Sequence, residues 1–252
     1  MEGFPSETLG ADGLPTGPVR GRGAGLNPGN RFEDIRLHVL GEHLDEVIAE
    51  NPDGTKVMTR VYADRTRSVI NRVDSPDLPF GWTINPYRGC EHGCIYCYAR
   101  PGHEYLGMSC GLDFETRIMA KIDAAELLRE ELSARTWKGE PISISGVTDC
   151  YQPIESKLRI TRRVLEVCAE FAQPVTLVTK NRLIARDLDV LQDLARHGAV
   201  HAAVSITTLD NRLASIMEPR ASSPRDRLAT VSELAGAGIP TMVMVAPIIP
   251  AI

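Results

Sequence analysis

The sequence of 252 residues lacks three features that would direct a protein to a membrane, to secretion or to bulk nucleic acid. Its longest apolar stretch, residues 238–252, contains three prolines and is too short to cross a bilayer. The first residues, MEGFPSETLGADGL, show neither the basic nor the apolar region of a secretion signal. The net charge of −5 provides no global positive field for phosphate backbones. We therefore expect a cytosolic (cytoplasmic) protein with no membrane partner, and not a histone-like binder.

A disulfide framework is also not expected. The chain has six cysteines, but the cytosol keeps thiols reduced, and three of the six crowd between Cys90 and Cys97. Clustered thiols in a cytosolic chain indicate a metal site.

The amino-terminal third of the chain divides into two segments. Residues 1–35 are rich in glycine, proline and polar residues without an apolar period, so we predict a disordered tail. Arg20 and Arg22 in this tail are expected to be solvated, with contact to nucleic acid as the alternative. Residues 36–80 carry the short apolar runs LHVL, KVMTRVYA and SVINRV, broken by the turn signal Asn-Pro-Asp-Gly. These runs predict strands of a small lead-in segment.

Residues 81–252 show a regular alternation of short apolar runs and helical patterns. A helix is predicted over 116–134, with Ile118, Ile122, Ala125, Leu128 and Leu132 on one stripe, and another over 183–194. Gly198 is expected to cap the second helix, and Ser223 and Pro224 are expected to begin a later one. The predicted strands are 82–88, 142–146, 175–179, 202–206 and 241–246.

Such alternation predicts a parallel sheet with right-handed crossovers, in an α/β fold that is either an open doubly wound sheet or a barrel of the TIM type. In both folds the functional loops follow the carboxyl ends of the strands. The chain stops soon after the fifth predicted strand, with no helix to cover it. We therefore expect this core to be truncated.

A three-cysteine loop follows the first predicted strand. Cys90, Cys94 and Cys97 have the spacing C-x3-C-x2-C, and no fourth cysteine lies nearby. A [4Fe-4S] cluster that transfers electrons normally takes four cysteine ligands, so three ligands leave one iron open. An open coordination position is typical of a metal centre that binds a reactant. The alternative is a zinc site in which His92 or His103 completes a Cys3His set.

The loop resembles the signature of the radical S-adenosylmethionine (SAM) superfamily, C-x3-C-x-aromatic-C, with Tyr96 at the aromatic position. The segments YRGCEHGCIYCYARPGHEYLG, GVTDCYQPIE, LVTKNRL, SITTLD, MEPRA and MVAPIIP extend the resemblance over about residues 64–252. They are similar to an uncharacterised bacterial branch of that superfamily related to spore photoproduct lyase.

The resemblance implies a fold, two cofactors and a partner. The fold is a partial (β/α)6 barrel, of which this chain contains five predicted strands. Cys90, Cys94 and Cys97 would hold a [4Fe-4S] cluster whose open iron is chelated by S-adenosyl-L-methionine. Reductive cleavage of SAM would give a 5′-deoxyadenosyl radical, and an electron donor such as flavodoxin or ferredoxin would supply the electron.

The resemblance also places cofactor-binding residues at strand ends. A Gly-Gly-Glu-type motif that holds the methionyl amine corresponds here to Ser-Gly-Val-Thr-Asp at 145–149. The motif differs, but Thr148 and Asp149 are candidate polar contacts; a solvated helix cap is the alternative for Asp149. Lys180 ends the third predicted strand, where a carboxylate or ribose would lie.

Further candidates follow the fourth and fifth predicted strands. Ser205 and Thr207 are candidates for the same carboxylate or ribose contacts. Val245 would form an apolar wall beside adenine, or serve as ordinary core. Arg220 would pair with a carboxylate or phosphate, or with Glu218.

Two cysteines outside the loop are interpreted separately. Cys150 is expected at the mouth of the site, where it would return a hydrogen atom to a substrate radical; a small buried core cysteine is the alternative. Cys168 falls on an apolar helical stripe and is expected in the core.

The sequence thus favours a cytosolic radical SAM enzyme whose substrate is unknown. Repair or modification of a nucleic acid is a narrower hypothesis, suggested by the spore photoproduct lyase resemblance and by Arg159, Arg162 and Arg163 on one helix. A solvated helix face explains those arginines equally well. The alternative class is a non-catalytic zinc or iron-sulfur binding protein.

Overall fold

The computed structural model describes residues 21–25, 28, 57–78 and 80–250. Most of the predicted tail, the run LHVL and the Asn-Pro-Asp-Gly turn lie outside the described residues. The prediction that Arg22 is solvated is wrong, because its guanidinium donates to the backbone carbonyl of Glu115 at 2.8 Å. Gly23 and Ala24 donate their N–H groups to the Glu115 carboxylate, a partner that composition alone does not predict.

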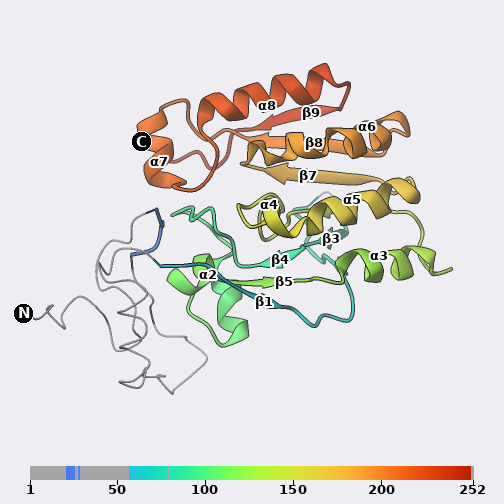
Figure 1. Cartoon of the computed structure of the whole chain (residues 1–252), viewed down its shortest axis with the longest axis horizontal. Coiled ribbons are helices and arrows are strands. Elements are labelled where there is room, and N and C mark those ends of the chain that lie inside the picture. Colours follow the sequence, from blue (N-terminus) through green and yellow to red (C-terminus); the bar gives the residue numbers. More distant parts are fainter. Residues whose placement is uncertain (1–20, 26–27, 29–56, 79, 251–252) are drawn as a thin grey trace, which may run out of the picture.

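A six-stranded mixed sheet forms the body of the molecule (Figure 1), with the strand order β2-β3-β6-β7-β8-β9. Every neighbouring pair is parallel except β2 and β3. The strands are β2 (Ile70–Arg72), β3 (Trp82–Ile84), β6 (Ile142–Ile144), β7 (Val175–Thr179), β8 (Val200–Ser205) and β9 (Thr241–Met244). All five predicted strands of the core are therefore present in one sheet, and their parallel pairing is confirmed.

The first predicted strand, 82–88, is wrong in one respect, because it divides into two short strands. β3 ends at Ile84 and β4 (Tyr87–Arg88) pairs with a different, three-stranded sheet of order β1-β5-β4. Pro86 has no backbone N–H to donate, and the Asn85 side chain turns to accept the N–H of Val147 at 2.8 Å. The break directs the chain away from the main sheet just before the cysteine loop.

The predicted helix over 116–134 is wrong in its first part. Residues Arg117–Ala120 form β5, which pairs parallel with β1 (Arg60–Ala63) and antiparallel with β4. The run alternates, since Arg117 is exposed whereas Ile118 and Ala120 are fully buried, and a four-residue alternation is too short to override a helical stripe in the sequence. The remaining stripe is confirmed on α3 (Ala124–Ser133), where Ala125, Leu128 and Leu132 are buried.

Helices separate the parallel strands along the chain. α3 packs beside α5 (Ile160–Glu170), and α5 packs beside α6 (Leu188–Arg196), so these helices form a row next to the sheet (Figure 1). In a barrel, strands that follow one another along the chain are neighbours in the sheet, and so are the helices between them. In a doubly wound sheet, by contrast, the strand order reverses. The other helices within the described residues are η2 (Arg100–Leu106), α2 (Leu112–Thr116), α4 (Glu155–Leu158), η3 (Arg182–Asp187), α7 (Asn211–Met217) and α8 (Pro224–Gly236).

Two predicted caps are confirmed. The Ser223 hydroxyl accepts the N–H of Asp226 at 3.1 Å, and Pro224 occupies the first turn of α8. Gly198 follows α6 with φ of +64°, a left-handed conformation that glycine adopts without steric cost. Ser223 and Pro224 thus begin α8, and Gly198 lies between the end of α6 and the start of β8.

One hydrophobic core lies between the sheet and the helices. Among its fully buried members are Ile84, Ile144, Leu177 and Val204, which come from four adjacent strands. The last strand differs, because Met242, Met244 and Val245 at the β9 edge remain exposed. Within the described residues no helix combines the length and apolarity needed to span a bilayer.

Candidate metal centre

The loop that carries the three cysteines runs from β4 to η2. Two of its residues have left-handed backbone conformations, Gly89 with φ of +80° and Gly93 with φ of +68°. A Cβ at Gly89 would lie 2.8 Å from the carbonyl oxygen of Phe114, so a side chain there would collide with α2. Glycine at these positions lets the loop turn twice within a few residues.

Backbone hydrogen bonds attach the loop to its surroundings at two points. Cys90 N–H donates to the carbonyl oxygen of Phe114 at 2.8 Å. Ile95 N–H donates to the carbonyl oxygen of Met217, the last residue of α7, at 3.0 Å. The loop is thereby attached to α2 on one side and to the segment after β8 on the other, at the carboxyl ends of the parallel strands.

The three thiols are protected to different degrees. Cys90 is buried, and Cys94 and Cys97 are half-buried. Burial raises the pKa of Cys94 to about 12 and that of Cys90 well above its ordinary value. A thiolate at these positions therefore needs a cationic partner, and iron supplies that charge, so the donor set fits an iron-sulfur cluster.

The same side chains do not converge as a single metal ion would require. Across the described part of the chain no group of three or more His, Cys, Asp or Glu side chains is arranged to hold one ion. In a cubane each cysteine binds a different iron, so the thiolates need not meet at one point. The predicted set of Cys90, Cys94 and Cys97 is compatible with a cubane cluster.

The two histidines proposed for a zinc site are committed to other partners. His92 Nδ1 lies 3.2 Å from Asp149 Oδ2, and its Nε2 lies 3.3 Å from the amide nitrogen of Asn181. His103 Nε2 lies 2.9 Å from the carbonyl oxygen of Arg117. Both rings are buried, so neither histidine is available as a fourth ligand without rearrangement.

Asp149 is the centre of a hydrogen-bonded network behind the loop. Besides His92, its carboxylate accepts the Thr179 hydroxyl at 2.8 Å and the Lys180 N–H at 2.8 Å. Burial alone would raise the pKa of Asp149, but His92 and these hydrogen bonds outweigh it and hold the pKa at about 2. Asp149 thus ties the cysteine loop to the end of β7, a role that neither predicted alternative, an amine contact or a solvated cap, includes.

Thr148 is also engaged within the protein. Its hydroxyl donates to the carbonyl oxygen of Tyr87 at 3.0 Å, and the residue is buried. Ser145, at the start of the same turn, has φ of +80°, a strained conformation for a non-glycine residue. Its hydroxyl accepts the N–H of Cys150 at 2.8 Å, which closes the turn after β6. The segment 145–149 therefore shapes the wall of the site.

Glu218 is the centre of a second hydrogen-bonded network. The sequence predicts this residue only as a partner of Arg220. Its carboxylate accepts hydrogen bonds from the hydroxyls of Tyr96 and Thr207 and from Arg227. Burial raises the pKa of Glu218, but Tyr96 and Arg227 outweigh that effect and lower it. Tyr96 and Thr207, both predicted as cofactor contacts, therefore meet at one buried carboxylate.

Arg220 does not pair with Glu218. The Arg220 guanidinium lies 3.1 Å from the Glu91 carboxylate, and the Arg220 backbone N–H donates to the carbonyl oxygen of His92 at 3.2 Å. The carboxylate that pairs with Arg220 belongs to Glu91, 129 residues away in sequence, whereas Glu218 is the only partner that the sequence names. Arg220 thus holds the middle of the cysteine loop.

The remaining predicted residues differ in exposure. Lys180 Nζ lies 5.9 Å from the centre of the Tyr96 ring, beside the loop. Ser205 is buried, and Val245 is 62% exposed, so Val245 does not serve as core. Cys150 is fully buried in the hydrophobic core, which fits the predicted alternative of a small core cysteine. Cys168 is also fully buried, as predicted.

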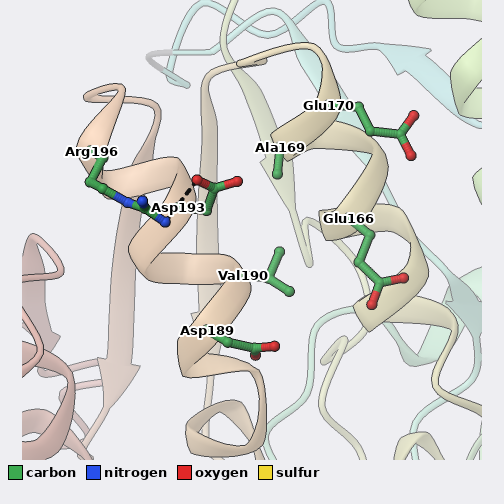
Figure 2. A pocket seen from close by; sticks show the side chains of 7 residues that line it. All are labelled: Glu166, Ala169, Glu170, Asp189, Val190, Asp193 and Arg196. Carbon is green, nitrogen blue, oxygen red and sulfur yellow. Dashed lines mark ion pairs between the residues drawn. The ribbon is translucent and has the colours of Figure 1, made fainter.

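A surface pocket lies elsewhere, between α5 and α6 on the outside of the molecule (Figure 2). Asp193 and Arg196 form an ion pair of 2.9 Å at its edge. No cysteine lines it, and it is open to solvent. Its lining residues are Glu166, Ala169, Glu170, Asp189, Val190, Asp193 and Arg196.

An α/β sheet with a glycine-turned three-cysteine loop at its carboxyl edge is the arrangement expected of a radical SAM protein, and comparison with known proteins agrees. The family model of the radical SAM superfamily matches residues 84–251, and the chain belongs to this family. Uncharacterized proteins of Mycobacterium tuberculosis and Mycobacterium bovis are 37% identical over 185 residues, 73% of this chain and 54% of theirs. The chain thus spans about half the length of these relatives.

Two further likenesses are more distant. A protein of Pseudomonas phage M6 named radical SAM Nalpha-GlyT isomerase is 28% identical over 169 residues, 66% of this chain and 33% of its own length. The solved structure of spore photoproduct lyase with dinucleoside spore photoproduct superposes with a TM-score of 0.56 at 22% identity. It covers 75% of this chain and 51% of the lyase, and it shows that the two share a fold.

Proposed function

We propose that this chain holds the catalytic core of a radical SAM enzyme. The observation that carries the proposal is the position of Cys90, Cys94 and Cys97 on a glycine-turned loop at the carboxyl ends of the parallel strands. These three thiolates would hold a [4Fe-4S] cluster. When bound, the cluster supplies one electron to the sulfonium of SAM, which releases methionine and a 5′-deoxyadenosyl radical.

The fold proposed for this core is a partial (β/α)6 barrel. The sequential order of β3, β6, β7, β8 and β9 supports it, as does the row of helices on the sheet. Completing the six-stranded barrel requires one more parallel strand beside β9, whose side chains remain exposed.

The residues of the chain divide into those that shape the site and those that would contact SAM. Asp149, Thr148 and Glu218 are satisfied by protein partners and would hold the loop and its walls in place. Lys180 lies beside the Tyr96 ring and would pair with the SAM carboxylate through its ammonium group. Val245, exposed at the end of β9, would contact the adenine ring.

We propose a nucleic acid or nucleotide as the substrate. The shared fold with spore photoproduct lyase, solved with a dinucleoside spore photoproduct, supports this class. Tyr98, next to the last cysteine of the loop, is 79% exposed and offers an aromatic face on which a base would stack. The net charge of −5 means that affinity would come from such local contacts rather than from a global field.

We propose that a low-potential protein such as flavodoxin or ferredoxin donates the electron. A chemical reductant replaces this donor in a test of the function. Protein reconstituted anaerobically with iron and sulfide is incubated with SAM and dithionite, and 5′-deoxyadenosine is measured by chromatography. We expect its formation to depend on Cys94, with Cys94→Ala inactive and Cys168→Ala unaffected.

The alternative of a non-catalytic protein makes a different prediction. A zinc protein would bind stoichiometric zinc in preference to iron, and a structural iron-sulfur protein would hold iron without cleaving SAM. Either result would contradict the proposed function.

A further inference from the structure

Residues 21–25, which we call the amino-terminal strap, lie against the outer side of the cysteine loop. Gly23 N–H donates to Glu115 Oε2 at 3.1 Å, and Ala24 N–H donates to Oε1 at 2.8 Å. The Arg22 guanidinium donates to the backbone carbonyl of Glu115 at 2.8 Å. A single residue at the end of α2 therefore receives three hydrogen bonds from the strap.

Glu115 passes this contact on to the cysteine loop. Its carboxylate is fully buried and accepts Arg100 Nη2 at 2.6 Å. Arg100 Nη2 also donates to the backbone carbonyl of Cys94 at 2.9 Å. A chain of charge-assisted hydrogen bonds thus runs from the strap through Glu115 and Arg100 to the middle cysteine.

The strap and the loop also meet sterically. A Cβ built on Gly23 would lie 1.7 Å from the carbonyl oxygen of Gly93 and 3.2 Å from the Ile95 side chain. A Cβ on Gly93 would lie 2.8 Å from Glu115 Oε2. The backbones of the strap and the loop approach so closely at Gly23 and Gly93 that only glycine fits at either position.

We propose that the strap and Glu115 position the Cys94 corner of the loop and limit solvent access to it. Glu115 is a positioning residue, since it acts on Cys94 through Arg100 and the Gly93 backbone. The inference deepens the proposed function and rests on it where it concerns a bound cluster. The contacts among the strap, Glu115 and Arg100 do not depend on a bound cluster.

The test measures the alkylation rate of each cysteine by iodoacetamide in the metal-free chain, read by mass spectrometry. Gly23→Ala removes the strap by collision and changes no buried side chain. We expect Cys94 to react about ten-fold faster or more, because displacing the strap removes hydrogen bonds to a buried carboxylate. Gly102→Ala is the matched control, since a Cβ there meets nothing within 4 Å. Cys168, fully buried in the core, reports on unfolding.

A second variant examines the carboxylate itself. Glu115→Gln keeps the size of the side chain but removes the charge that Arg100 and the strap share, so Cys94 should again react faster. In reconstituted protein the same variant should bleach faster in air and alter the electron paramagnetic resonance spectrum of the reduced cluster. If Glu115→Gln also exposes Cys168, the Gly23→Ala arm decides.

The outcomes separate this inference from the proposed function. An unchanged Cys94 rate in Gly23→Ala, with Cys168 protected, would overturn the role of the strap even if the wild-type protein cleaves SAM. A protein that binds no cluster would refute the proposed function, while the alkylation rates would still decide whether the strap orders the loop.

Discussion

At the scale of single residues, the cysteine loop carries the three thiols that we propose as cluster ligands. Cys90 is buried, whereas Cys94 and Cys97 are half-buried and closer to solvent. Burial of a thiol disfavours its thiolate, and a bound cation reverses that preference. Removing one ligand should therefore weaken metal binding at the other two.

The first prediction follows from this coupling. Changing Cys90, Cys94 or Cys97 to Ala should remove most of the iron and the brown absorption near ~400 nm that iron-sulfur charge transfer produces. Iron and sulfide analysis of anaerobically reconstituted protein measures the loss. Cys168→Ala is the control and should retain full iron, because Cys168 lies in the hydrophobic core. Full iron in the three loop variants would refute the ligand assignment.

Asp149 carries the second prediction. Its carboxylate accepts hydrogen bonds from Thr179, Lys180 and His92, so Asp149→Ala leaves several buried donors without an acceptor. Breaking a buried charged network costs about 3 kcal/mol or more, and we expect a loss of that size in the free energy of unfolding. Urea denaturation of the metal-free protein measures it.

Glu170→Ala is the matched control for Asp149. Glu170 pairs with Arg129 on the surface, where water screens the interaction, so the midpoint of unfolding should hardly change. Equal midpoints for Asp149→Ala and the wild-type protein would show that the network contributes nothing to stability.

Residues differ in how far the sequence predicts their role. The three cysteines are evident because their spacing is local, and Cys168 is evident from its helical stripe. The partners of Asp149 are not, because Thr179 lies 30 residues away and only the parallel pairing of β6 with β7 brings the two together. Glu115 has no signal in the sequence, since its partners are backbone N–H groups from the strap and the Arg100 side chain, which no local spacing connects to it.

At the scale of elements, α8 begins as the sequence predicts. The Ser223 hydroxyl caps the helix by accepting the N–H of Asp226. Ser223→Ala should therefore lower the free energy of unfolding by about 1 kcal/mol. Thermal or urea unfolding measures the change.

Ser133→Ala is the comparison for this cap. Its hydroxyl donates to the Arg129 carbonyl at 2.7 Å within α3 and satisfies no free helix end. An equal loss of stability in both variants would argue against a capping effect.

Glu218, in the segment between β8 and α8, should make the free energy of unfolding depend on pH. Glu218 has a lowered pKa in the folded protein, so folding favours its charged form. Its stabilising contribution is fully present above the unfolded pKa of about 4.3 and declines as the pH falls toward the lower folded value. Glu218→Gln should flatten the dependence of unfolding free energy on pH below about 5. A profile as steep as that of the wild-type protein would contradict this assignment.

Helical and strand patterns conflict in one element, and the structure shows why. Residues 116–134 carry a continuous helical stripe, yet Arg117–Ala120 form a strand because β1 and β4 flank them. Those pairings join segments distant in sequence, and four residues of alternation do not reveal them. Segments with longer strand runs, such as Val175–Thr179, are predicted correctly, because this run consists of apolar and β-branched residues.

At the scale of the whole molecule, strand order determines which loops meet. β6, β7 and β8 are neighbours, so the turns after their carboxyl ends lie together beside the cysteine loop. The sequence predicts this edge from the alternation of strands and helices alone. It does not predict the side-chain networks of Asp149 and Glu218 that close the edge.

The last prediction uses this common edge. SAM added to the reduced, reconstituted protein should change its electron paramagnetic resonance spectrum, because ligation at the open iron alters the electronic environment of the cluster. Lys180→Ala should lower the affinity for SAM about ten-fold to a hundred-fold, since one charge-assisted hydrogen bond contributes about 1.5 to 3 kcal/mol. The spectral change should then require a correspondingly higher SAM concentration. Lys157→Ala, on the exposed side of α4, is the control and should respond as the wild-type protein does.

The contrast between these two lysines locates the SAM site. A spectrum that changes equally in both variants would remove Lys180 from the binding site, although the cluster assignment would stand. A spectrum indifferent to SAM in the wild-type protein would contradict direct ligation and favour an iron-sulfur protein without SAM chemistry. A response lost only in Lys180→Ala would place the SAM carboxylate at the end of β7, next to the network that Asp149 holds together.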